Sequence, residues 1–383
     1  MGESSQGVTV VALLADPDAP TEVAQRMAKD LPDRLANAFD GQREFSVEVV
    51  SEPFTAGTED LSTLTRRIVD RAGEENWDVV VALTDLPLHA GRRKLAADLS
   101  HEHGVALLSL PSLGGLRFHR RARRAVERAV LSLLDGRPAD APEPRRPRPL
   151  RRLAGRFAGR FAGVHSGPVD DEETADLRYV VSGPGGYLRV LGGMVRANRP
   201  WRLIPGLSKA LAAALASGAI ATVNSTVWSL AIALDTPRLV IATIGSIALM
   251  IGWLIVDAHL WDRATGDSPQ ARTRAALYNA STVVTLSIGV LVCYVGLLII
   301  NLLWVLFIVN GEVFASMTKS PLRAAEYWTL AWFVASVATV GGALGSGLES
   351  DEAIRAAAYS KREQERRRML EDEGEDEGEG EGD

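Results

Sequence analysis

Charged side chains that could bind a ligand follow apolar runs in the first third of the chain. The candidates are Asp16, Asp18, Asp85, Arg92 and Arg93. The run 8–15 precedes the first two, and the run 77–83 precedes the other three. If both runs are parallel strands, their carboxyl ends share one edge of a sheet, where doubly wound domains bind their ligands. Loops at strand ends are also polar for structural reasons alone, so ligand binding and ordinary loop polarity are both open interpretations.

The residue patterns of common catalytic and cofactor sites are absent from the sequence. It contains no glycine-rich dinucleotide turn, no P-loop and no Gly-x-Ser-x-Gly elbow. His101 and His103 are two residues apart, and on a helix such neighbours point in different directions and chelate a metal poorly. A single cysteine, Cys293, cannot build a multi-cysteine metal site. The sequence therefore predicts no metal, no cofactor and no catalytic residue.

An arginine-rich segment is the most informative functional feature of the sequence. Residues 145–160 contain seven arginines, interleaved with leucine and phenylalanine: Arg145, Arg146, Arg148, Arg151, Arg152, Arg156 and Arg160. Such a segment is typical of a surface that binds anionic lipid, where each basic residue contributes about 1 kcal/mol. Arginine also neutralises nucleic-acid phosphates, but the nearby apolar runs favour lipid over nucleic acid. A merely solvated spacer is the third interpretation.

Alternating apolar runs and amphipathic segments predict an α/β domain over residues 1–135. The expected strands are 8–15, 45–50, 77–83 and 105–110, and the expected helices are 21–39, 61–72, 92–103 and 117–134. Strands that alternate with helices predict a parallel sheet with helices on both faces.

The second half of the chain predicts an all-α transmembrane bundle over residues 204–348. Four apolar runs, 207–234, 239–256, 276–309 and 324–348, are long enough to cross a bilayer. The third run is too long for one perpendicular crossing, so it must tilt, extend beyond the bilayer or break near Asn301. Acidic residues fall at the ends of the runs, which makes an anchor a better interpretation than an ion-coupled transporter.

The basic residues that flank these runs predict the orientation of the chain in the membrane. With four spans and the N-terminus inside, thirteen Lys and Arg residues flank the bundle on the cytoplasmic side and three on the outer side. The N-terminus also lacks the pattern of a signal peptide. We therefore expect an integral plasma-membrane protein with both termini in the cytoplasm. Residues 136–203 form a basic linker and juxtamembrane segment, and residues 349–383 a charged helix with a disordered acidic tail.

Small residues recur every four positions in two of the predicted spans. The first stripe contains Ala210, Ala214 and Gly218, and the second contains Ala338 and Gly342, with Gly345 alongside. Small side chains let helix backbones approach closely. The stripes serve either packing within one bundle, which we favour, or the formation of a homo-oligomer.

Two segments resemble known families. The sequence Gly-Met-Val-Arg-Ala-Asn-Arg-Pro-Trp-Arg at 193–202 resembles uncharacterised multi-pass membrane proteins of GC-rich bacteria over about residues 180–350. That resemblance implies a membrane location and no known activity. The strand 79–86, the segment 104–110 and the long helix after it resemble archaemetzincin-type zinc peptidases. In that family the helix carries His-Glu-x-x-His, whereas here it contains His119 alone, so the resemblance implies a fold without the zinc site.

These features together predict a membrane-anchored cytoplasmic module that binds, senses or scaffolds an unidentified small molecule or protein. Anionic membrane lipids are the expected second partner. One alternative is a component of a small-solute transporter or channel. The other is a membrane-tethered enzyme that uses polar residues at the strand ends. The strong preference for arginine over lysine points to a bacterial source.

Overall fold

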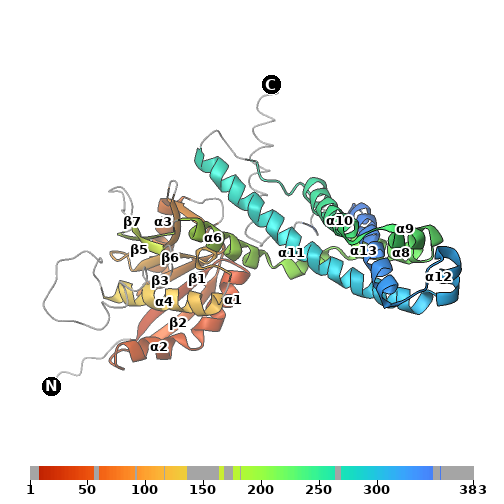
Figure 1. Cartoon of the computed structure of the whole chain (residues 1–383). Coiled ribbons are helices and arrows are strands. Elements are labelled where there is room, and N and C mark those ends of the chain that lie inside the picture. The colour runs from red at the N-terminus through yellow and green to blue at the C-terminus, as the bar shows by residue number, and fades with distance from the viewer. Residues whose placement is uncertain are drawn as a thin grey trace, which may run out of the picture. The chain divides into compact units, whose positions relative to one another are not determined.

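A computed structural model describes residues 8–55, 60–90, 93–115, 117–135, 164–167, 176–181, 183–263, 269–347 and 354. These residues form two compact units, one within residues 1–197 and one within residues 198–359 (Figure 1). The arginine-rich segment 145–160 and Arg92 lie outside the described residues. An α/β domain followed by a helical region is confirmed.

The N-terminal unit is built on a mixed sheet of eight strands. The strands are β1 Thr9–Ala15, β2 Phe45–Ser51, β3 Val79–Thr84, β4 Leu88–Ala90, β5 Arg93–Ser100, β6 Val105–Ser109, β7 Val164–Gly167 and β8 Leu177–Val181. Their order is β2-β1-β3-β6-β5-β8-β7, and β4 pairs with β5. β2, β1, β3 and β6 are parallel and match the four predicted strands, whereas β5, β8 and β7 run antiparallel to their neighbours.

The prediction of a wholly parallel sheet was wrong because residues 92–103 were predicted to be a helix. Six successive residues of β5, from Leu95 to Ser100, are buried, because the strand has β6 on one side and β8 on the other. The composition Lys-Leu-Ala-Ala-Asp-Leu favours a helix locally. Pairing with strands distant in sequence overrides that local preference, as tertiary contacts often do.

Helices cover both faces of the sheet, as predicted (Figure 1). They are α1 Ala19–Ala28, α2 Leu31–Ala38, α3 Leu61–Glu75, the 3-10 turn η1 Pro111–Leu113, α4 Phe118–Leu134 and α6 Gly183–Asn198. Leu64 and Ile68 of α3 pack on Leu14, Val80 and other residues of one face. The alternate positions in the same strands are also buried, and α1 and α4 contact the strands and each other.

The sheet and its covering helices extend beyond the predicted domain end at residue 135. β8 adds to the open edge of β5, and α6 packs on the loop between β6 and α4, where Gly192 and Gly193 approach the backbone of Gly115 and Pro111. Sequence periodicity assigned these two elements to a linker because β8 is short and α6 begins with glycines.

The second unit consists of helices. They are η2 Pro200–Arg202, α7 Leu203–Gly206, α8 Ser208–Thr222, α9 Ser225–Ala233, α10 Thr236–Asp257, α11 Pro269–Ile308, α12 Gly311–Thr318 and α13 Ala324–Ser346. Three of them, α10, α11 and α13, are long and apolar enough to cross a membrane. The number rises to four if the bent pair Gly185–Gly206 and Ser208–Thr222 is one span.

Two of the predicted spans differ in detail from the helices observed. The run 207–234 is two helices, α8 and α9, because the Asn224 side chain accepts a hydrogen bond from the Thr226 N–H and begins a new helix. The run 276–309 lies within α11, which is 40 residues or about 60 Å long. α11 continues through Asn301, whose side-chain amide donates to the Leu297 carbonyl of the preceding turn at 2.8 Å.

The two small-residue stripes face each other within this unit. A Cβ atom added to Gly342 of α13 would lie 3.0 Å from the Ala214 side chain and 3.2 Å from the Ala210 carbonyl oxygen of α8. Ala214 and Ala338 also pack together with Leu297 of α11. The small side chains therefore set the distance between α8, α13 and α11.

Candidate functional site

The carboxyl edge of the parallel strands contains the predicted acidic candidates, and Asp16 is part of its framework. Asp16 is fully buried at the end of β1. Its carboxylate accepts a 2.7 Å hydrogen bond from the Thr55 hydroxyl, and its carbonyl accepts one from Thr21 at the start of α1. Asp16 therefore holds the loop after β2 and the start of α1 against β1, which is a structural role.

The other predicted candidates differ in their surroundings. Asp85 is buried directly after β3, the strand next to β1. Asp18 precedes α1 and has a positive φ of 73°. Arg93 is exposed at the start of β5. Among the described residues, no group of three or more His, Cys, Asp or Glu side chains could hold a metal ion.

Hydroxyl groups satisfy the backbone of the loops at this edge. The Ser109 hydroxyl donates to the Leu86 carbonyl at 2.8 Å, and the Ser112 hydroxyl donates to the Leu95 carbonyl at 2.6 Å. The Leu86 N–H in turn donates to the Thr84 side chain at 3.1 Å. Buried backbone groups require such partners, so these serine and threonine side chains stabilise the edge.

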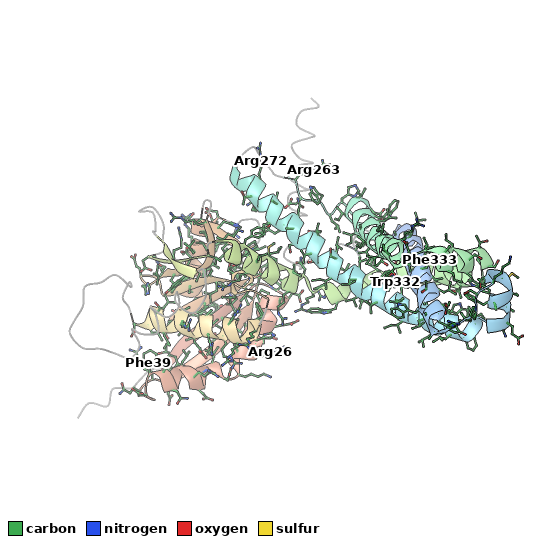
Figure 2. The ribbon with its side chains drawn as sticks, viewed as in Figure 1. Arg26, Phe39, Arg263, Arg272, Trp332 and Phe333 are labelled. Carbon is green, nitrogen blue, oxygen red and sulfur yellow. The ribbon has the colours of Figure 1, made fainter. Side chains whose placement is uncertain are left out.

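A cluster of basic side chains lies where α1, α4 and α6 meet, and sequence reasoning missed it. Arg26 of α1, labelled in Figure 2, places a guanidinium nitrogen 2.9 Å from His119 Nε2 of α4. Arg196 of α6 lies over the Phe118 ring, 5.4 Å from its centroid. Burial, together with the charges of Arg26 and Arg196, lowers the pKa of His119. The arginines of α4 are adjacent in the sequence, but only the tertiary structure shows that Arg196 of α6 joins them.

A second polar arrangement joins three elements at the opposite edge of the sheet. With the proton on Nδ1, His101 donates to the Asp176 carboxylate at 2.7 Å, and its Nε2 accepts from the Ser132 hydroxyl at 3.0 Å. The His101 side chain is 4% exposed. The order of groups matches a Ser-His-Asp triad. His103 contacts the Ser100 hydroxyl instead, so the two histidines have separate partners.

The space beside Ser132 is small. A cavity of about 10 Å³, which has room for one water molecule, is lined by Ser132, Arg128, Tyr179 and apolar side chains of the sheet. The backbone N–H groups around Ser132 lie within α4, so they are bonded inside the helix and form no oxyanion hole. The arrangement therefore serves first as a structural link between α4, the β5–β6 turn and the start of β8.

Hydroxyl groups also meet in the helical unit. Thr243 of α10, Tyr294 of α11 and Ser336 of α13 lie within 3.0–3.3 Å of one another. The indole of Trp332, which is labelled in Figure 2, donates to Thr243 at 2.6 Å. These groups carry no charge. Such hydrogen bonds are typical of contacts that hold membrane helices together.

Comparison of the chain with protein-family models, with curated proteins and with solved structures finds no match. The two resemblances noted in the sequence therefore stay predictions.

Proposed function

We propose that the protein is a membrane-anchored binding module, in which a helical bundle of four spans holds an α/β domain on the cytoplasmic side of the membrane. The observation that carries this proposal is the apolar surface of the long helices. Large side chains such as Ile241 at 69%, Val256 at 74% and Phe307 at 81% exposure point away from the unit. Apolar surface of this extent is unfavourable in water and suits a lipid environment.

The contacts at the two ends of the bundle support four antiparallel spans. α9, before α10, contacts α12, before α13, and the Trp228 and Phe314 rings lie 5.6 Å apart. The other end joins residues from the start of α8, the end of α10 and the segment after α13 in one apolar cluster, which includes Leu207, Leu260 and Ile354. Four spans in alternating directions would produce these two sets of contacts.

Cysteine accessibility tests this placement. In a Cys293→Ser background, Ala315→Cys lies in α12 on the predicted outer side, and Gln42→Cys lies on the exposed surface of the α/β domain. In intact cells, an impermeant thiol reagent should label Ala315→Cys. The same reagent should label Gln42→Cys and Glu365→Cys only after the cells are permeabilised. Labelling of Gln42→Cys in intact cells would place the domain outside and refute the proposal.

A second candidate function is hydrolysis at Ser132, because the distances from Asp176 to His101 and from His101 to Ser132 fit nucleophile activation. The small cavity and the missing oxyanion donors make this function the weaker candidate. If Ser132 is an activated nucleophile, a fluorophosphonate probe should modify the wild-type protein and leave Ser132→Ala unmodified. Equal absence of modification in both proteins would exclude this activity.

A further inference from the structure

The loop between β6 and α4 lies against one arginine of α4 and one arginine of α6. We call the residues Gly114, Gly115, Arg121 and Arg189 the glycine corner. Gly114 has a φ of +83°, and a Cβ atom there would lie 2.9 Å from Arg189 Cγ and 3.1 Å from Arg121 Nη1. A Cβ atom on Gly115 would lie 2.7 Å from the Gly192 carbonyl oxygen. Only glycine lets α6 pack this closely, so the glycines bring Arg189 of α6 beside Arg121 of α4.

Both side chains are partly buried, and a hydrogen bond positions that of Arg121. Arg121 Nη1 donates to the Leu113 carbonyl at 2.9 Å, which fixes its guanidinium against the loop. Burial, and then the charge of Arg121, lowers the pKa of Arg189. Surroundings that lower the pKa of an arginine disfavour its positive charge. A bound anion would reverse that effect, because it interacts favourably with both guanidinium groups.

The wider surroundings add positive potential. Arg26, His119 and Arg196 lie at the same junction of α1, α4 and α6. Among the described residues, the first turn of α4 contains no acidic residue and no side-chain cap. The backbone N–H groups at this helix end therefore place a partial positive charge beside the loop. Glu22 near His119 and the Asp30–Arg123 ion pair at 3.0 Å offset part of this charge.

We propose that the glycine corner binds a phosphate group through Arg121 and Arg189. Arginine matches phosphate oxygens with paired N–H donors. Because the two guanidinium groups come from different helices, a phosphate can accept hydrogen bonds from both through separate oxygens. The site lies at the carboxyl edge, where doubly wound sheets bind ligands. The inference rests on the proposed binding function and names its ligand class, which is either a soluble phosphate compound or a lipid headgroup.

The test is titration of inorganic phosphate into the full-length protein in phosphatidylcholine nanodiscs, followed by calorimetry. Arg121→Gln and Arg189→Gln should each weaken binding about tenfold or more, because each removes charge-assisted hydrogen bonds. The matched control is Arg120→Gln, which removes an exposed arginine one position away on α4 and should bind phosphate like the wild type. No binding by the wild type, or unchanged binding by both corner variants, would overturn the inference.

Two further measurements complete the experiment. Circular dichroism checks folding, and if a glutamine variant is unfolded, Arg189→Lys must still weaken binding, because it keeps the charge and loses the paired donors. Phosphate binding that persists in nanodiscs with phosphatidylglycerol, at matched ionic strength, identifies a soluble ligand. Suppressed binding identifies the lipid headgroup. Cysteine accessibility reports membrane placement independently, so failure of the anchored-module proposal and failure of this site are distinguishable.

Discussion

At the scale of single residues, the buried ion pair of Asp98 and Arg178 should have the largest effect on stability. The pair joins facing positions of β5 and β8 through contacts of 3.0 and 3.3 Å, and both side chains are 2–3% exposed. Arg178→Met should destabilise the α/β domain by about 3–5 kcal/mol, because it removes the Arg178 charge from beside the buried Asp98 carboxylate. Hydrogen exchange of β3 and β6 in the full-length protein measures the change.

Two variants test that explanation. Arg34→Met removes the exposed ion pairs with Glu127 and Asp30 and should cost about 1 kcal/mol or less. Adding Asp98→Leu to Arg178→Met should recover most of the loss, because replacing a whole buried pair by apolar groups is often neutral. A double variant as unstable as Arg178→Met would show that packing, and not the uncompensated charge, is responsible.

His119 should make the stability of the α/β domain depend on pH. Burial and the positive charges of Arg26, Arg196 and Arg123, opposed by Glu22, lower the pKa of His119 in the folded protein. His119 therefore binds a proton more readily in the unfolded chain. The free energy of unfolding should fall as the pH decreases below about 6.5, until the pH is lower than the pKa of His119 in the folded protein. His119→Gln should reduce the difference in unfolding free energy between pH 7.5 and pH 5.5. An unchanged pH dependence would mean that other groups cause it.

At the scale of elements, the contact between α8 and α13 depends on glycine. A Cβ atom on Gly345 would overlap the Ala213 side chain, and one on Gly342 would be 3.0 Å from Ala214. Gly342→Val and Gly345→Val should each destabilise the helical unit by about 1–3 kcal/mol through overpacking. Gly252→Val on α10 is the control, because a Cβ atom added there has no neighbour within 4 Å. Thermal unfolding in detergent measures the effect, and a similar loss in the control would contradict the packing explanation.

The elements also show why periodicity succeeds for some segments and fails for others. α4 was predictable because its apolar residues follow one helical stripe. β5 was not, because a strand buried on both faces has no alternation, and its residues are good helix formers. α6 begins with the sequence Gly-Pro-Gly-Gly, which is typical of a turn, although the helix starts there.

At the scale of the whole molecule, the α/β domain should need residues up to about 198 to fold alone. A fragment of residues 1–198 should be soluble and cooperative in unfolding, whereas residues 1–135 should aggregate. The shorter fragment lacks β8, which leaves the edge of β5 open and Asp98 without Arg178. Expression, gel filtration and circular dichroism of the two fragments test this expectation. A folded, monomeric 1–135 fragment would show that β8 and α6 are accessory.

The sequence by itself determined the order of an α/β domain and an apolar helical region, because hydrophobic runs and their periods are local properties. It also located the polar residues that follow β1 and β3. The tertiary structure alone decided which distant residues meet. Arg121 and Arg189, His101 and Asp176, and Asp98 and Arg178 are each 68 or more residues apart. Such pairs leave no periodic pattern in the chain, since the pairing of strands and the close approach of glycines bring them together.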